Sequence, residues 1–132
     1  MDQHWHGYAW TGHGQDIVRD AARRPGPDSG FLSNALPPLV TAHWLLKPRN
    51  QIKGTWTDPA DAVAWLLARY EETPEPGGPS LELRTELARD ALPRGNDVTW
   101  AYWLGGGRFV HYSVLSCPRR TEPDVRCPAP PN

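Results

Sequence analysis

The sequence predicts a small α+β domain, and three observations lead to that prediction. Two runs rich in aromatic and β-branched residues flank three consecutive glycines, residues 105–107. Apolar side chains repeat at helical spacing over residues 59–72. The chain has 132 residues, 15 prolines and a hydrophobic fraction of 39%. We therefore expect one loop-rich domain, in which the seven tryptophans help to build a compact aromatic core.

The strongest local pattern indicates a β-hairpin with strands at about residues 98–104 and 108–116. Glycine adopts the positive φ that a tight reversal needs without steric cost, so residues 105–107 suit the turn. Side chains alternate along a strand, which places Trp100 and Tyr102 on one face of the hairpin and Trp103 on the other. A short strand over residues 5–11 is expected in the same antiparallel sheet.

Residues 59–72 form the clearest helix of the sequence. Asp58 is a good N-cap, and Pro59 suits the first helical position because a missing N–H costs nothing there. Residues 80–92 match a strand or a helix, and Ser80 as N-cap with Gly95 beyond the end favours the helix. Thus at least two helices are expected.

Two further segments have helical features. Residues 15–23 carry apolar side chains on one side and are followed by Pro25, which ends a helix. Residues 39–46 are an apolar run that fits either a buried helix or a central strand, and the prolines before it favour a helix. The predicted architecture is an antiparallel sheet packed on one face by two to four helices. Residues 1–117 form this single domain, and residues 118–132 a Pro-rich tail expected to be mobile.

Charge and targeting patterns exclude several classes of protein. The net charge is −1, which makes nucleic acid an unlikely partner. The amino end has no signal-peptide pattern and no apolar run is long enough for a membrane span, so a cytoplasmic protein is expected. Cys117 and Cys127 would then be reduced, and their spacing alone matches no zinc motif. The alternative is a disulfide that closes a small loop at the carboxyl end. The alanine-, arginine- and proline-rich usage is typical of a GC-rich bacterial genome.

The histidines of the amino end are candidate metal ligands. His4 and His6 lie two residues apart, so both imidazoles would face the same side of a strand. Paired imidazoles suit zinc, copper or iron, and His13 or a carboxylate could complete the site. Two solvated histidines on an exposed strand are the alternative, in which case the protein has no cofactor.

The preferred functional hypothesis is a non-enzymatic accessory protein that binds a protein partner, or itself, through exposed aromatic residues. Tryptophan, tyrosine and arginine are the residues most favoured at interface hot spots. On the hairpin these are Trp103, Arg108 and Tyr112. The alternative for Gly105 to Arg108, a phosphate-binding loop, is disfavoured because that stretch leads into a strand rather than a helix.

A small enzyme is the alternative hypothesis. It would be metal-dependent through the amino-terminal histidines, or an RNase-like hydrolase that uses His111 with an arginine. The chain contains no Gly-x-Ser-x-Gly, no Walker A and no dinucleotide-binding motif. Catalytic residues therefore remain unassigned from the sequence.

Overall fold

The computed structural model describes residues 2–119, 122 and 124–131. Its centre is an antiparallel sheet of four strands in the order β2-β1-β4-β3. The strands are β1 (His4–His13), β2 (Gly54–Trp56), β3 (Val98–Trp103) and β4 (Arg108–Cys117). Strands β1 and β4 pair along their full length, from His4 opposite Cys117 to His13 opposite Arg108. The α+β class is confirmed.

The hairpin at the carboxyl end is confirmed, with β3 and β4 paired from Val98 opposite Val114 to Trp103 opposite Phe109. Gly106 and Gly107 both have a φ of +73° in the turn between the strands. A side chain at either position would strain the backbone, which is why the reversal needs glycine.

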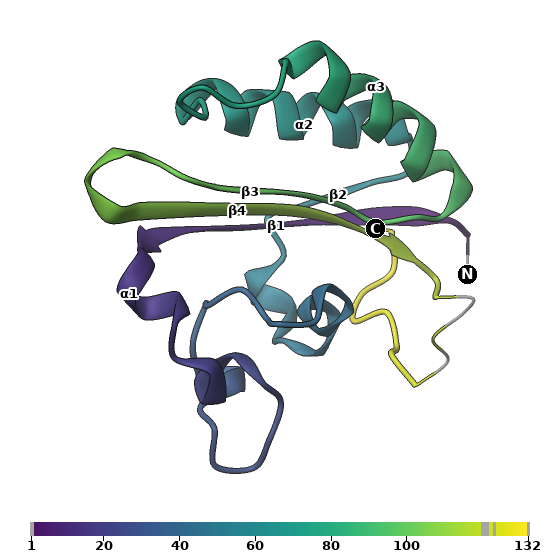
Figure 1. The fold of residues 1–132 in the computed structure, drawn as a ribbon. Helices are drawn as coiled ribbons and strands as arrows, with labels where there is room; N and C mark the ends of the chain where they lie inside the picture. Colours follow the sequence, from purple (N-terminus) through teal and green to yellow (C-terminus); the bar gives the residue numbers. More distant parts are fainter. Residues whose placement is uncertain (1, 120–121, 123, 132) are drawn as a thin grey trace.

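Two long helices, α2 (Pro59–Glu72) and α3 (Leu81–Ala91), cover one face of the sheet (Figure 1). The Asp58 side chain caps α2 by accepting from the Ala60 N–H at 2.9 Å, and the Ser80 hydroxyl caps α3 by accepting from Leu83 at 3.1 Å. Both helices occur where the sequence predicts them. Beneath them lies an apolar core that includes Trp5, Val63, Leu66, Leu92, Trp100, Tyr102, Val110 and Val114.

The opposite face of the sheet is covered as well, which the sequence did not indicate. Helix α1 (Gly14–Ile17), short 3₁₀ turns and the carboxyl-terminal segment lie below the sheet (Figure 1). A second cluster there joins Tyr8, Trp44, Leu45, Leu115 and Cys117. The sheet is thus buried between a helical layer and a layer of irregular chain.

Two helix predictions on this side are corrected. The helix expected over residues 15–23 is broken into α1 and a 3₁₀ turn at Asp20–Arg23. Residues 39–46 form neither α-helix nor strand but a 3₁₀ turn, Thr41–Leu46. In both segments burial of a few side chains, such as Trp44 and Leu45, takes the place of a regular helical face. None of the helices among the described residues is long and apolar enough to span a bilayer.

Candidate metal centre

Two histidines and two cysteines meet beneath one end of the sheet. His4 and His6 come from the start of β1, Cys117 ends β4, and Cys127 belongs to the carboxyl-terminal segment. One ligand atom from each of the four side chains lies within 4.8 Å of the other three. The antiparallel pairing places Cys117 directly opposite His4, and the period of two adds His6 on the same face.

The cluster has the size of a cage for a single ion. The Nε2 atoms of His4 and His6 lie 3.2 and 3.3 Å from the Cys127 sulfur. A tetrahedral Zn²⁺ with bonds of about 2.0–2.3 Å would separate neighbouring ligand atoms by roughly 3.3–3.8 Å. The two distances to Cys127 are close to that value, and the widest pairs, up to 4.8 Å, would have to shorten by about 1 Å around an ion.

The outward nitrogens of both rings are held by hydrogen bonds. The Nδ1 atom of His4 lies 2.7 Å from the Asp2 carbonyl oxygen, and that of His6 lies 2.8 Å from the Thr55 hydroxyl. A carbonyl only accepts, so the His4 proton resides on Nδ1 and Nε2 presents its lone pair to the cluster. Outer hydrogen bonds of this kind fix the orientation and tautomer of metal-ligating histidines.

Acceptors crowd the inner side of the cluster. The Ala129 carbonyl oxygen lies 3.1 Å from His4 Nε2 and 3.0 Å from His6 Nε2. With the His4 proton on Nδ1, the Nε2 lone pair faces this carbonyl oxygen, an unfavourable contact between two acceptors, while the Cys127 thiol donates to the same carbonyl at 3.1 Å. A cation among these atoms, either a metal ion or a second ring proton, removes the conflict. The donor set therefore fits a positively charged guest.

Both cysteines are free thiols, and Cys117 is fully buried while Cys127 is half-buried. The contact with Cys117 lowers the pKa of the Cys127 thiol, and the hydrogen bond from His6 acts in the same direction. The pKa of Cys117 is raised by the same contact and by burial. Cys127 is thus the sulfur that first becomes a thiolate, the form in which cysteine binds metal.

A buried tyrosine lies in the same cluster as Cys117. Tyr8 follows His6 on the same face of β1 and is fully buried in the cluster with Cys117. Among the described residues its hydroxyl has no hydrogen-bond partner. Burial raises the pKa of this hydroxyl, and the charges of Cys117 and Cys127 act in the same direction.

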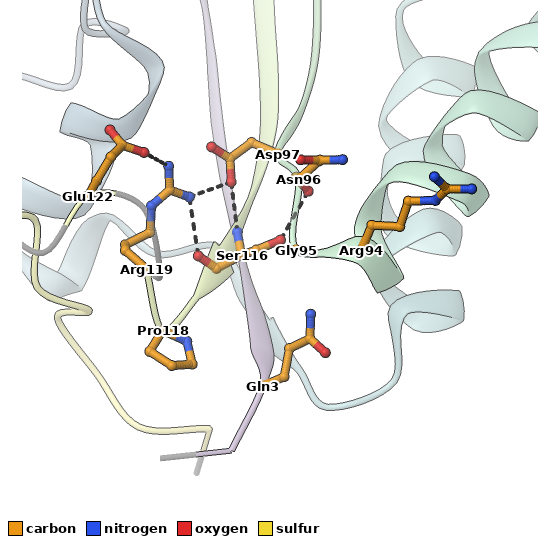
Figure 2. Close-up of a pocket in the computed structure, with 9 residues that line it drawn as sticks. All are labelled: Gln3, Arg94, Gly95, Asn96, Asp97, Ser116, Pro118, Arg119 and Glu122. Atoms are coloured by element: carbon orange, nitrogen blue, oxygen red, sulfur yellow. Dashed lines mark hydrogen bonds and ion pairs between the residues drawn. The ribbon is translucent and has the colours of Figure 1, made fainter.

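An ion-pair network holds the chain after Cys117 (Figure 2). The Arg119 guanidinium donates to Asp97 at 2.6 Å and also pairs with Glu122. The Asp97 carboxylate in turn accepts from the Ser116 N–H at 2.9 Å. A polar hollow of about 320 Å³ opens beside these residues, and Figure 2 shows Gln3 and Arg94 at its other side. Of the residues beyond it, Val125 and Cys127 pack against the lower cluster of Tyr8 and Cys117 (Figure 1), and the mobility expected of residues 118–132 stays a prediction.

His13 does not belong to the cluster. It is the last residue of β1, is exposed and lies opposite Arg108. It lies nine positions along an extended strand from His4, or about 30 Å away. The third and fourth side chains of the cluster are cysteines instead. The spacing of His4 and His6 indicated half of the site, whereas no local pattern joined them to Cys117 and Cys127.

The three residues expected to bind a partner have different environments. Trp103 is 54% exposed, and Arg108 is exposed at the start of β4. Tyr112 is only 3% exposed, and its hydroxyl bonds the Thr73 hydroxyl at 2.6 Å under the helices. Tyr112 is therefore a core residue, because its position on β4 faces α2 rather than solvent.

His111 is buried on the lower face against Trp44, with the ring centroids 5.8 Å apart. Burial lowers its pKa from 6.5 to about 4, and the positive charge of Arg23 adds to the effect. A ring that is neutral at pH 7 and only 8% exposed suits packing better than proton exchange with a substrate.

This lowered pKa predicts a specific acid sensitivity. Between pH 6.5 and 4 the unfolded chain protonates His111 and the folded chain does not, so stability falls as the pH falls through that window. The expected contribution is roughly 3 kcal/mol. In His111→Gln the urea-derived free energy of unfolding should depend less steeply on pH than in the wild type. Other acid-titrating groups are common to both proteins, and parallel curves would contradict the assignment.

Comparisons with protein-family models, curated proteins and solved structures give no match for this chain. Function is therefore inferred from the chemistry of the site itself.

Proposed function

We propose that this protein is a non-enzymatic binding protein whose fold is closed by a structural Zn²⁺ ion. The observation that carries the proposal is the convergence of His4, His6, Cys117 and Cys127 within 4.8 Å. Four protein ligands complete a tetrahedral shell, whereas catalytic zinc sites keep one position open for water or substrate. The burial of three of the four ligands supports a structural role.

The donor set favours zinc over other common divalent ions. Two imidazoles and two thiolates form a borderline-soft set that Mg²⁺ and Ca²⁺, which prefer oxygen, do not select. A reducing cytoplasm, the location proposed here, keeps the two thiols available as ligands. Bound Zn²⁺ would supply positive charge where the ring lone pairs and the Ala129 carbonyl converge.

The ion would link segments that are far apart in the chain. His4 and Cys127 are separated by 123 positions, and the described residues around Cys127, 124–131, form no strand or helix. Zinc binding would thus fix the carboxyl-terminal segment over the lower face of the sheet. Stability gained in this way is folding free energy rather than catalytic power.

The partner-binding role rests on the far end of the hairpin. Trp103 is 54% exposed and packs edge-to-face on Phe109, with ring centroids 5.0 Å apart. An exposed aromatic ring whose position is fixed by packing, next to an exposed arginine, is typical of an interface anchor. We assign this role to Trp103 and Arg108, and Tyr112 is omitted because it is buried.

The metal assignment is tested by the stoichiometry and spectrum of the loaded protein. We expect one zinc per chain by elemental analysis after loading and desalting. The Co²⁺-substituted protein should show the visible bands of tetrahedral cobalt and a near-ultraviolet thiolate-to-metal transition. His13→Ala is the matched control, because this exposed histidine of the same strand should leave both results unchanged. A protein that retains no zinc, or a cobalt spectrum without a thiolate band, would contradict the proposal.

A Cys–His nucleophile is the second candidate function. It is favoured by one observation, the lowered pKa of the Cys127 thiol beside the His6 ring. Three results together would support this enzyme over the structural site: the isolated protein contains no zinc, Cys127 is alkylated rapidly, and added zinc does not slow the alkylation. Protection of both cysteines by one equivalent of zinc would exclude it.

A further inference from the structure

Among the residues that the structure describes, no strand pairs with the outer edge of β3. It lies at the end of the order β2-β1-β4-β3 and spans Val98–Trp103, whereas the other edge, β2, has only three residues. The strand contains no charge and no proline, the usual devices that prevent edges from pairing. An edge of this kind is suited to pair with another strand.

The free backbone groups of the edge can be identified. The N–H of Leu104 donates to the Arg108 carbonyl of β4 at 2.8 Å. Because backbone groups alternate in direction along a strand, those of Thr99, Ala101 and Trp103 point away from β4. The side chains of these same three residues are exposed on the lower face. Their groups are therefore open to a strand from outside.

An apolar groove of about 390 Å³ runs beside this edge, between β3 and α3. Leu87 and Leu83 contribute to it and are 61% and 49% exposed. Val98 and Trp100 form its floor from the strand. Two half-exposed leucines one turn apart form an apolar stripe on the helix, and covering this stripe with another apolar surface is energetically favourable.

The charges of α3 select the orientation of what covers it. Glu82 and Glu86 lie exposed in its first half, where the half-buried Arg84 is already paired with Glu75. Arg89 lies exposed toward its end, and Asp90 is paired with Arg94 just beyond the helix at 3.0 Å. A second α3 in antiparallel orientation would place the free glutamates of each helix toward Arg89 of the other. A parallel neighbour would place like charges together.

We infer that β3 pairs with β3 of a second copy of this chain, forming a two-fold dimer with a continuous eight-stranded sheet. This inference specifies the partner in the proposed binding function and is independent of the metal centre. The helices of both copies stay on the same face of the joined sheet, so the leucines of one α3 pack against those of the other. Such an isologous contact closes after two copies.

The register follows from the directions of the free groups. Residues that face outward must pair with outward-facing residues, which permits Ala101 opposite Ala101 of the second copy. The smallest side chain of the strand then lies on the two-fold axis, and each Trp103 lies beside Thr99 across the interface. Apart from the leucines of α3, only residues of the strand take part, and Asp97 keeps its bond to Ser116.

The test is the mass of the zinc-loaded full chain by sedimentation equilibrium from about 1 to 100 µM, a range that resolves micromolar dimers. We expect a species of twice the 14.8 kDa chain mass. Ala101→Lys, which places two ammonium groups on the axis, should shift the protein to monomer. Leu87→Glu should raise the dimer dissociation constant at least tenfold. Ala60→Lys, an exposed alanine at the start of α2 near the β2 edge, is the matched control and should dimerise normally.

Two outcomes would overturn the inference. One is a 14.8 kDa mass at every concentration, which would mean that the edge binds a different protein or none. The other is a dimer that Ala101→Lys leaves intact, which would locate the contact elsewhere. If either result is found with one zinc bound per chain, the β3-paired dimer is excluded and the proposed metal centre still stands. Retention of the circular dichroism spectrum in each variant shows that a loss of dimer is not a loss of folding.

Discussion

Cys127→Ser is expected to abolish stoichiometric zinc binding and to release the carboxyl-terminal segment. A serine hydroxyl does not ionise at neutral pH and is a poor ligand for zinc. At a free zinc concentration about 1,000 times Kd, the metal stabilises the folded state by roughly 4 kcal/mol, all of which the variant should lose. The measurement is urea unfolding of wild type and variant, each with zinc and with a chelator.

The result specific to a structural site is a lost response to metal. Chelation should lower the urea midpoint of wild-type unfolding to that of Cys127→Ser and leave the midpoint of the variant unchanged. Trypsin adds a local measure, because Arg126 is exposed and lies next to Cys127. Cleavage there should be slow in the zinc-loaded wild type and fast in Cys127→Ser. His13→Ala again serves as control, and a variant that still responds to zinc would contradict the ligand assignment.

Lys47→Met is expected to cost roughly 3 kcal/mol of stability, because hydrogen bonds from a buried charged group are worth about 1.5–3 kcal/mol each. Lys47 is only 2% exposed, and its ammonium lies over the Phe31 ring, 4.2 Å from the centroid. The ammonium donates to the carbonyl oxygens of Phe31 and Asn34, both at 2.9 Å. Methionine retains the apolar stem and removes these bonds, so the loop around residues 31–34 loses its anchor.

Lys53→Met is the matched control, because the side chain of Lys53 is exposed. We expect its free energy of unfolding to stay within about 0.5 kcal/mol of the wild type. Equal losses of unfolding free energy in the two variants would show that the contacts of the Lys47 ammonium with the two carbonyls and the Phe31 ring contribute nothing specific. Hydrogen exchange of residues 31–34, faster in Lys47→Met only, would locate the effect.

Local patterns predicted those elements whose signals lie within a few residues. The caps at Asp58 and Ser80 started α2 and α3 where expected, and the glycine turn joined β3 to β4. The same reasoning failed for residues 15–23 and 39–46, where side chains such as Trp44 are buried without a repeating pattern. In that region packing against the sheet outweighs helical propensity.

The two halves of the candidate site were accessible to different degrees. His4 and His6 could be paired from sequence because strand periodicity is local. Cys117 joined them through the register of β1 with β4, and Cys127 through the return of the tail. His13 was a wrong third choice, because an extended strand rises about 3.3 Å per residue and carries His13 far from His4 and His6.

By itself the sequence determined the secondary elements that caps, turns and side-chain periodicity encode, together with the class to which they belong. Only the tertiary structure decided which face buries Tyr112, that both faces of the sheet are covered, and that two cysteines meet two histidines. The physical reason is that these depend on strand register and on long loops closing. Contacts between residues more than a hundred positions apart are fixed by the summed packing of the whole chain rather than by any short stretch of it.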